Sequence, residues 1–409
     1  MIAAVVVIAV AAGAVMLMNN GSNDNPNTPV TPDDPVIPPK EKSDVEKARE
    51  AAAAEAEKNY SKGGLYRLKA VIAPTDMASV SGSVQLIDVI EDWYAKVYGD
   101  LYEGADKLTL ADAKKDTAFW NKYCNYEKMA WTNPDGTISY KTEYITGSKE
   151  LNTYTIPAKG ADVGILIGGS YASIAYYMDC FEHNVKPYSA EANKITEITT
   201  KLQRLLYSGL VMSSVTNSYP ELAKMYPENY LERCTSLAKY DKEALAEDLK
   251  NAAAIPDSVV ILMASNGMSA DLTFTVETAS LYGAYCYFNN AHTIPESLQV
   301  IDTEGRIFGY GTTVDKVIED MQLRMYKVWW SVQKLGNPVH KAYFESNKGK
   351  ALSATSTGTY ICEFFGWDIS LMDGKEHSTE DLLEQKPDVL IFYTNDSRTQ
   401  DEEMRATAV

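Results

Sequence analysis

One serine lies in a stretch that could present a nucleophile. Gly168-Gly-Ser170-Tyr-Ala172 follows an apolar run and precedes a helical pattern, and it approximates the G-x-S-x-G turn of serine hydrolases. A hydrolase also needs an acid and a histidine later in the chain, and Asp368 or Asp373 with His377 are the nominal partners. Alanine replaces the last glycine of the motif, and an acid so close to the histidine is unusual for separate triad loops. Hydrolysis by this serine stays an alternative, and we expect a protein that is not an enzyme.

Metal ligands are few and scattered. The chain has four histidines and five cysteines, with no C-x-x-C and no H-E-x-x-H spacing. The odd number of cysteines leaves at least one free thiol unless two chains pair. We therefore predict no metal site and no resident cofactor.

The overall charge excludes one large class of partners. Lys and Arg number 38 against 56 Asp and Glu, which gives a formal net charge of −18. Nucleic-acid backbones require a basic surface, so we expect no nucleic-acid partner. A length of 409 residues suggests two or three folded units.

The amino-terminal residues predict a membrane location. Residues 2–18 carry no charge, and their length fits a short membrane-spanning helix or a signal segment. Residues 19–60 are first rich in Pro, Asn and Asp and then in Ala and charged residues, which favours an extended tether and a solvated helix. We expect the chain to be anchored in the cell membrane with the remainder outside the cytoplasm.

Residues 61–150 carry two similar segments, each a polar loop followed by an amphipathic helix. This region resembles the paired calcium loops of dockerin-like modules, which precede the binding domain in some archaeal surface proteins. A calcium loop needs oxygen ligands at alternate positions. Lys114 stands where the second loop needs a ligand, so we expect a degenerate helical module that binds calcium poorly, and a plain helical spacer is the alternative. The first loop keeps Ser79, Ser81 and Asp88 as ligand residues and Gly82 as the turn glycine, and the second keeps only Asp112 and Asp116.

Beyond residue 150 the pattern predicts an α/β fold. Apolar runs rich in β-branched and aromatic residues predict strands covered on both faces, within residues 161–170, 256–268, 283–290, 340–346 and 386–396. Residues 311–336 hold apolar side chains at three- and four-residue spacing, which predicts one helix of roughly 36 Å at 1.5 Å per residue.

The order of these motifs resembles the class III substrate-binding proteins of ABC importers. Glu243-Ala-Leu leads to Pro256-Asp257 and an apolar run, and Glu380-Asp-Leu-Leu leads to Pro387-Asp388 and another. Residues 293–321 are similar to the family's entry into its inter-lobe helix. The resemblance implies a first lobe at 151–310, a connecting helix at 311–336 and a second lobe at 337–409. The second lobe is shorter than in the family, so we expect an exposed sheet edge or one completed by another chain.

The resemblance also implies a function and a set of sites. The family captures bulky chelates such as corrinoids, haem and iron–siderophore complexes between its lobes, and one glutamate per lobe docks onto the permease. Glu243 and Glu380 match those glutamates, although helix N-termini favour acids in any case. A cell-surface structural or adhesive protein without a small ligand remains the second alternative. The candidate ligand-binding residues follow the predicted strands: Ser170, Tyr171, Asn266, Met268, Ser356, Thr357, Tyr360, Tyr393 and Asn395.

Overall fold

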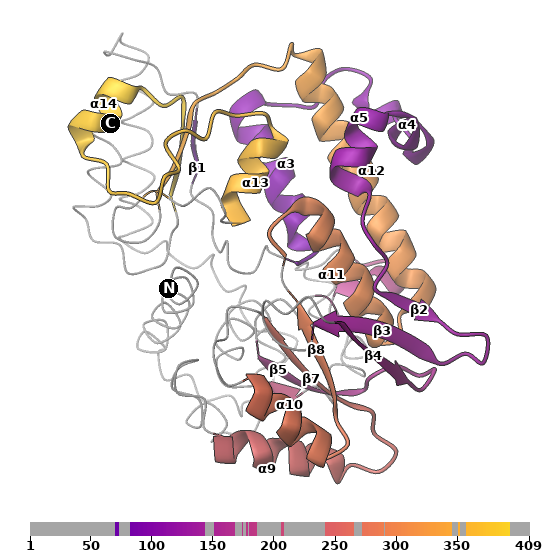
Figure 1. Ribbon diagram of the computed structural model, residues 1–409. Coiled ribbons are helices and arrows are strands. Elements are labelled where there is room, and N and C mark those ends of the chain that lie inside the picture. Colours follow the sequence, from indigo (N-terminus) through magenta and orange to yellow (C-terminus); the bar gives the residue numbers. More distant parts are fainter. Residues whose placement is uncertain are drawn as a thin grey trace, which may run out of the picture.

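The computed structural model describes a mixed fold of helices and three β-sheets (Figure 1). The described residues are 70–72, 82–143, 151–167, 174, 177–178, 180–185, 206–207, 242–265, 272–289, 291–345, 351 and 357–392. In this part of the chain, no helix is both long and apolar enough to cross a bilayer. The apolar residues 2–18 and the tether at 19–60 lie outside the described residues.

Sheet C consists of four parallel strands in the order β6-β5-β7-β8. Alternate residues of β7 point to opposite faces, so Val260 and Leu262 pack beneath two helices while Ile261 and Met263 join the main core. Burial on both faces explains the continuous apolar runs in the sequence. The elements are β5 (Val163–Ile167), β6 (Leu206–Tyr207), β7 (Val260–Ser265), β8 (Tyr285–Asn289), α9 (Lys242–Ala253) and α10 (Leu272–Leu281).

Sheet A consists of three parallel strands in the order β1-β10-β9. Its first strand comes from the amino-terminal side of the chain, where Val71 pairs with Leu390. The second lobe was expected to expose a sheet edge or to be completed by another chain. In the described residues, the strand beside β10 comes from the amino-terminal side of the same chain. The elements are β1 (Ala70–Ile72), β9 (Ala342–Glu345), β10 (Val389–Phe392), α13 (Thr357–Phe364) and α14 (Thr379–Gln385).

Sheet B is an antiparallel sheet of β2 (Ala130–Thr132), β3 (Ile138–Glu143) and β4 (Leu151–Ile156). Buried Ile138 and Tyr140 alternate with more polar neighbours, as expected for a sheet with one covered face. The hypothesis of a purely helical module at residues 61–150 missed this sheet. Its strands also continue past residue 150, so the sheet crosses that predicted boundary.

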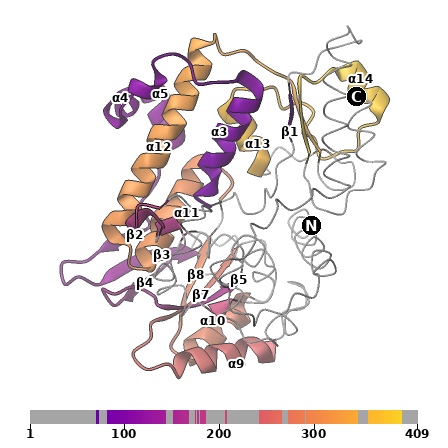
Figure 2. The ribbon, with the colours of Figure 1, turned by 180° about the vertical axis from the view of Figure 1, so that it is seen from behind.

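One long helix, α12 (Gly311–Lys334), runs along the molecule from sheet B towards the end that carries sheet A (Figure 2). The helix predicted at 311–336 is confirmed, and its inward positions such as Val317, Met321 and Val328 are buried. It packs against α11 (Ile294–Ile307) and α3 (Gln85–Tyr98). Shorter helices cover its outer side: η2 (Ala105–Lys107), α4 (Leu110–Lys115), α5 (Thr117–Phe119) and η3 (Trp120–Cys124).

The residues that were compared with calcium loops stabilise helices instead. The carboxylate of Asp88 accepts hydrogen bonds from Arg324 at 2.6 Å and from the hydroxyl of Tyr177 at 3.0 Å, which ties α3 to α12. Asp112 forms a capping box with Thr109 at the start of α4. Asp116 caps α5 through the backbone N–H of Phe119 at 3.2 Å. Ser79 and Ser81 lie outside the described residues.

A single hydrophobic core connects the three sheets. It contains Met263 of sheet C, Tyr140 of sheet B and Phe344 of sheet A, together with the inward faces of α3, α11 and α12. Residues 82–143 thus share their core with the long helix. The structure holds the sheets in fixed relation through buried apolar contacts, which resist independent movement.

Candidate functional site

The segments that follow the strands of sheets A and C meet at one point. Gly82 precedes α3 on the segment after β1, Ser297 lies in α11 after β8, and Tyr360 lies in α13 after β9. The Gly82 N–H donates to the Ser297 hydroxyl at 3.3 Å, and the Ser297 and Tyr360 hydroxyls are 3.5 Å apart. We call these three residues the junction. Because it joins the exits of two parallel sheets, the carboxyl edges of both sheets face the same central region.

Local geometry explains the junction. Gly82 has a φ of +66°, and a Cβ there would lie 3.0 Å from Cγ1 of Val300 on α11. A larger residue would therefore be strained and would push α3 away from α11. Ser297 is fully buried, so its hydroxyl serves the two neighbouring segments and does not face solvent.

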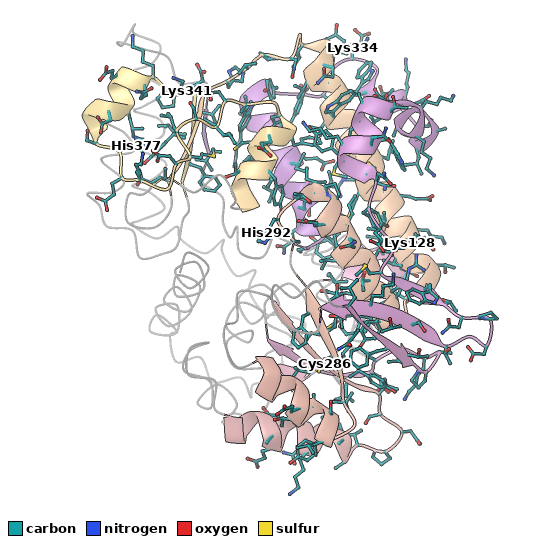
Figure 3. The ribbon with its side chains drawn as sticks, viewed as in Figure 1. Lys128, Cys286, His292, Lys334, Lys341 and His377 are labelled. Atoms are coloured by element: carbon teal, nitrogen blue, oxygen red, sulfur yellow. The ribbon has the colours of Figure 1, made fainter. Side chains whose placement is uncertain are left out.

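His292 is exposed beside the junction, between β8 and α11. The Thr293 hydroxyl caps α11 by accepting from the Glu296 N–H at 3.3 Å, and the Glu296 carboxylate accepts from the His292 N–H at 2.7 Å. These bonds fix the backbone at the point where β8 ends. Figure 3 shows His292 at the centre of the molecule, between the helices above it and sheet C below.

Two aspartates set the amino ends of the sheets. Asp162 precedes β5 and its carboxylate accepts the backbone N–H of Val259 at 2.8 Å, beside the start of β7. Asp388 does the same for Lys341 at 2.8 Å, beside the start of β9. The Pro-Asp motif occurs once per predicted lobe. In sheet C the bond to the backbone is made by Asp162, while Asp257 of the motif lies in the turn before β7. Within each sheet these bonds align the amino ends of neighbouring strands, so the carboxyl ends of those strands are aligned as well.

Most predicted ligand-binding residues lie outside the described residues: Ser170, Tyr171, Asn266, Met268, Ser356, Tyr393 and Asn395. The strands that lead to them are described, and β7 ends at Ser265 and β10 at Phe392, each one residue before a predicted position. Thr357 is the first residue of α13. Tyr360 is buried at the junction, where its hydroxyl lies 3.5 Å from that of Ser297.

The two predicted docking glutamates occupy equivalent places in the fold. Glu243 is the second residue of α9 and Glu380 the second residue of α14. Each helix leads to an inner strand of its sheet, β7 or β10, and the two helices lie at opposite ends of the molecule (Figure 1). In α14 the helix start is already capped by Ser378 and Asp381, so Glu380 is not required as the cap.

The acid–histidine pair of the hydrolase alternative does form. His377 Nε2 lies 3.1 Å from Asp373 Oδ1, and its ring contacts Tyr343 edge-on at 5.6 Å between centroids. Partial burial would raise the pKa of Asp373, but hydrogen bonds from the Lys375 backbone and from His377 outweigh it and lower the pKa to about 2. Tyr343 packs with Leu382 of α14, so this pair lies on the α14 face of sheet A.

Buried cysteines make no reactive site in the described chain. Cys124, Cys180, Cys286 and Cys362 are buried and free. Burial raises the pKa of Cys286 to about 12 and that of Cys362 well above the usual thiol range, so the nucleophilic thiolate is suppressed. Within the described ranges, no group of three or more His, Cys, Asp or Glu side chains is arranged to hold a metal ion.

Comparison with known proteins gives structural similarity only. No family model and no curated protein matches the chain. The crystal structure of a periplasmic binding protein from Veillonella parvula DSM 2008 is similar with 15% identity and a TM-score of 0.42, covering 67% of this chain and 78% of that chain. A periplasmic solute binding protein from the same organism has 15% identity and a TM-score of 0.37, covering 64% and 71%. At these values neither similarity shows a family.

The sequence interpretation missed the residues that form the junction. Gly82 was interpreted as a calcium-loop glycine, Ser297 received no role, and His292 was treated as one of four scattered histidines. A signal for His292 was present, because Thr293 and Glu296 match a capping box directly after a predicted strand. The contacts of Gly82 and Tyr360 with Ser297 join residues 215 and 63 positions apart, and local patterns do not reveal such pairs.

Proposed function

We propose that the chain is an extracytoplasmic solute-binding protein that captures a small molecule between sheets A and C for a membrane transporter. The observation that carries this proposal is the junction of Gly82, Ser297 and Tyr360. It brings together the exits of two parallel sheets, and ligands of open α/β sheets bind beside the carboxyl ends of their strands.

The shared core adds a physical reason for tight capture. The main core runs from sheet C through α11 and α12 to sheet A. A binding region held by such a core is largely preformed, so little free energy is spent on ordering it when a solute binds.

We further propose a class of solute and a membrane partner. The solute is a bulky chelate of the corrinoid, haem or iron–siderophore class. The membrane partner is an ABC permease, contacted through Glu243 and Glu380 on the two outer helices. Residues 1–18 hold the chain at the membrane, with residues 19–60 as the tether.

Ligand binding is tested on the purified full chain by native mass spectrometry and thermal unfolding. The probes are cyanocobalamin, haemin and a ferric hydroxamate siderophore. A ligand that binds only the folded chain and is present at a free concentration of one hundred times its Kd stabilises the chain by about 2.7 kcal/mol. A chelate that forms a one-to-one complex and raises the unfolding temperature supports the proposal. If none binds while a generic ester is hydrolysed in a Ser170-dependent reaction, the capture function is wrong.

A matched pair of variants locates the binding region. His292→Ala removes an exposed side chain beside the junction, whereas Leu281→Ala removes an exposed side chain at the end of α10, on the outer side of sheet C. Loss of one contact in a ligand site costs about 1 kcal/mol, or roughly fivefold in Kd. We expect His292→Ala to weaken binding by about that factor and Leu281→Ala to leave it unchanged.

Docking is tested separately from capture. Glu243→Lys and Glu380→Lys reverse the charges that would meet a basic permease surface. We expect each variant to bind the chelate normally and to lose stimulation of the permease ATPase. Normal stimulation in the double variant contradicts this docking role.

A further inference from the structure

Exposed apolar side chains gather at one end of the molecule. Among the described residues eight large apolar side chains are exposed, and four of them lie here: Leu101 (42%), Tyr102 (41%), Leu335 (44%) and Val339 (65%). These four and the half-buried Trp330 are called the end patch. Single exposed apolar residues are normal on soluble proteins, but a concentration of them marks an interaction surface.

Two of the five end-patch residues, Tyr102 and Trp330, contact each other directly. The rings of Tyr102 and Trp330 meet edge-on at 5.8 Å between centroids. The Tyr102 N–H donates to the Ser331 hydroxyl at 3.1 Å, which fixes the loop after α3 against the last turn of α12. The Lys334 ammonium lies 5.0 Å from the centre of the Trp330 ring. Tyr102 and Trp330 are therefore held in place against the end of α12.

Val339 is connected to the same surface. It precedes His340, whose ring lies 5.6 Å from that of Tyr98 at the end of α3. The loop that carries Leu101 follows directly, and the Tyr94 hydroxyl donates to the Asp100 carbonyl at 3.3 Å. Val339 and Leu101 thus flank one aromatic cluster.

The composition of the end patch fits the boundary between water and lipid. Tyr and Trp are enriched there because each has an apolar ring and a polar atom. Leu and Val enter the apolar layer, and a lysine extends its ammonium to the headgroups while its stem covers apolar surface. Lys334 over Trp330 provides this last arrangement.

The first described strand, β1, begins at the same end. Ala70 begins β1 and pairs with Val389, which pairs with Ala342 at the start of β9. All three strands are parallel, so Ala70 lies at the same edge of sheet A as Lys341, which directly precedes β9. Two strand spacings separate β1 from β9, about 10 Å. Figure 3 shows Lys334 and Lys341 along this same end.

We propose that the end patch rests on the lipid surface of the membrane to which the amino-terminal segment tethers the chain. This inference depends on the membrane tether in the proposed function. Contact through the amino edge of sheet A points the carboxyl ends of its strands away from the bilayer. The solute-binding region then stands above the membrane and is open to solution. Helix α9 lies at the far end in this orientation, so the lipid contact describes the tethered chain before it docks onto a permease through Glu243 and Glu380.

The test uses the full chain in phosphatidylcholine vesicles whose acyl chains are brominated. Leu335→Cys places a single environment-sensitive fluorophore in the end patch, and Val339→Cys places it at a second patch position. Leu281→Cys is the matched control, because Leu281 is 82% exposed at the end of α10, far from the patch. All three are made with Cys234→Ser, since the four described cysteines are buried.

We expect vesicles to shift the emission of the two patch probes to shorter wavelength. Brominated lipid should reduce the emission intensity of these probes at least twofold. The Leu281→Cys probe should show neither change. Equal behaviour of patch and control probes in vesicle-bound chain overturns the membrane contact while the tether stands. The membrane contact is also overturned if the patch probes already emit at shorter wavelength than the Leu281→Cys probe before vesicles are added, because a protein segment then covers the patch. Failure of the chain to float with vesicles overturns the tether and this contact together.

Discussion

The Thr142 hydroxyl bonds both backbone groups of Phe288. It accepts from the Phe288 N–H at 2.8 Å and donates to the Phe288 carbonyl at 3.2 Å. Two residues earlier along β8, the Tyr140 hydroxyl donates to the Cys286 carbonyl at 2.9 Å. β8 is the last strand of sheet C, and its free edge is thus closed by side chains of β3 where another strand would otherwise pair.

Replacement of Thr142 by valine tests this closure. The substitution keeps the shape but leaves a buried N–H and a buried carbonyl without their partner, which costs about 1–3 kcal/mol. We expect Thr142→Val to lower the free energy of unfolding by about 2 kcal/mol, measured by urea denaturation. Thr153→Val, at an exposed position of β4, is the matched control and should stay within about 0.5 kcal/mol of the parent. Equal stability of the two variants would contradict the edge-closing role.

Two glycines provide a second test, at the crossing of the turn after β4 and the end of α11. Gly160 has a φ of +76°, and a Cβ on it would lie 2.5 Å from the backbone nitrogen of Gly309. Gly283 has a similar φ of +67° but open space around it. We expect Gly283→Ala to cost about 1 kcal/mol for its left-handed backbone alone. Gly160→Ala must also separate two backbones, so its loss in thermal unfolding should clearly exceed that of Gly283→Ala.

Much of the α/β architecture was predictable because its signals are local. The five predicted strand segments each contain an observed strand, and the apolar stripe from Val314 to Val332 gave one continuous helix. A stripe of this kind requires only that one helical face be buried, which the sequence displays directly.

Sheet B and β1 were missed for two different reasons. Sheet B has the alternation of a half-buried sheet, with Tyr140 inside and Lys141 outside, but its residues were compared with a helical module. β1 has only three residues, and its partner β10 is more than 300 positions later. A segment this short carries no periodicity, and its place is decided by the unpaired edge of β10.

The candidate site was predictable by position and not by contact. The rule that ligands bind at strand carboxyl ends placed candidates such as Asn266 and Tyr393 directly after observed strands. It could not show that Tyr360 is turned into the core towards Ser297, because side-chain direction in α13 depends on packing against α11. Whether the candidates bind a solute stays a prediction.

The pKa of Asp373 predicts a pH dependence of stability. Its folded value of about 2 lies below the ordinary value of 3.8, so ionised Asp373 stabilises the folded state above pH 3.8. That contribution is lost as pH falls from 3.8 towards 2. We expect the stability gap between the parent and Asp373→Asn to be constant above about pH 5 and to close towards pH 2, measured by urea denaturation at each pH. A gap that persists unchanged at pH 2 is incompatible with the Lys375 and His377 hydrogen bonds.

The place of β1 in sheet A is tested by two truncations. A chain that begins at Ser61 keeps β1, whereas a chain that begins at Gly82 lacks it and leaves the edge of β10 unpaired. Three paired residues at about 1 kcal/mol per hydrogen bond correspond to roughly 3 kcal/mol, and an exposed edge also promotes aggregation. We expect the first chain to unfold like the parent in urea and the second to be less stable and to bind a hydrophobic dye. If the chain from Gly82 is as stable as the chain from Ser61, β1 does not stabilise sheet A.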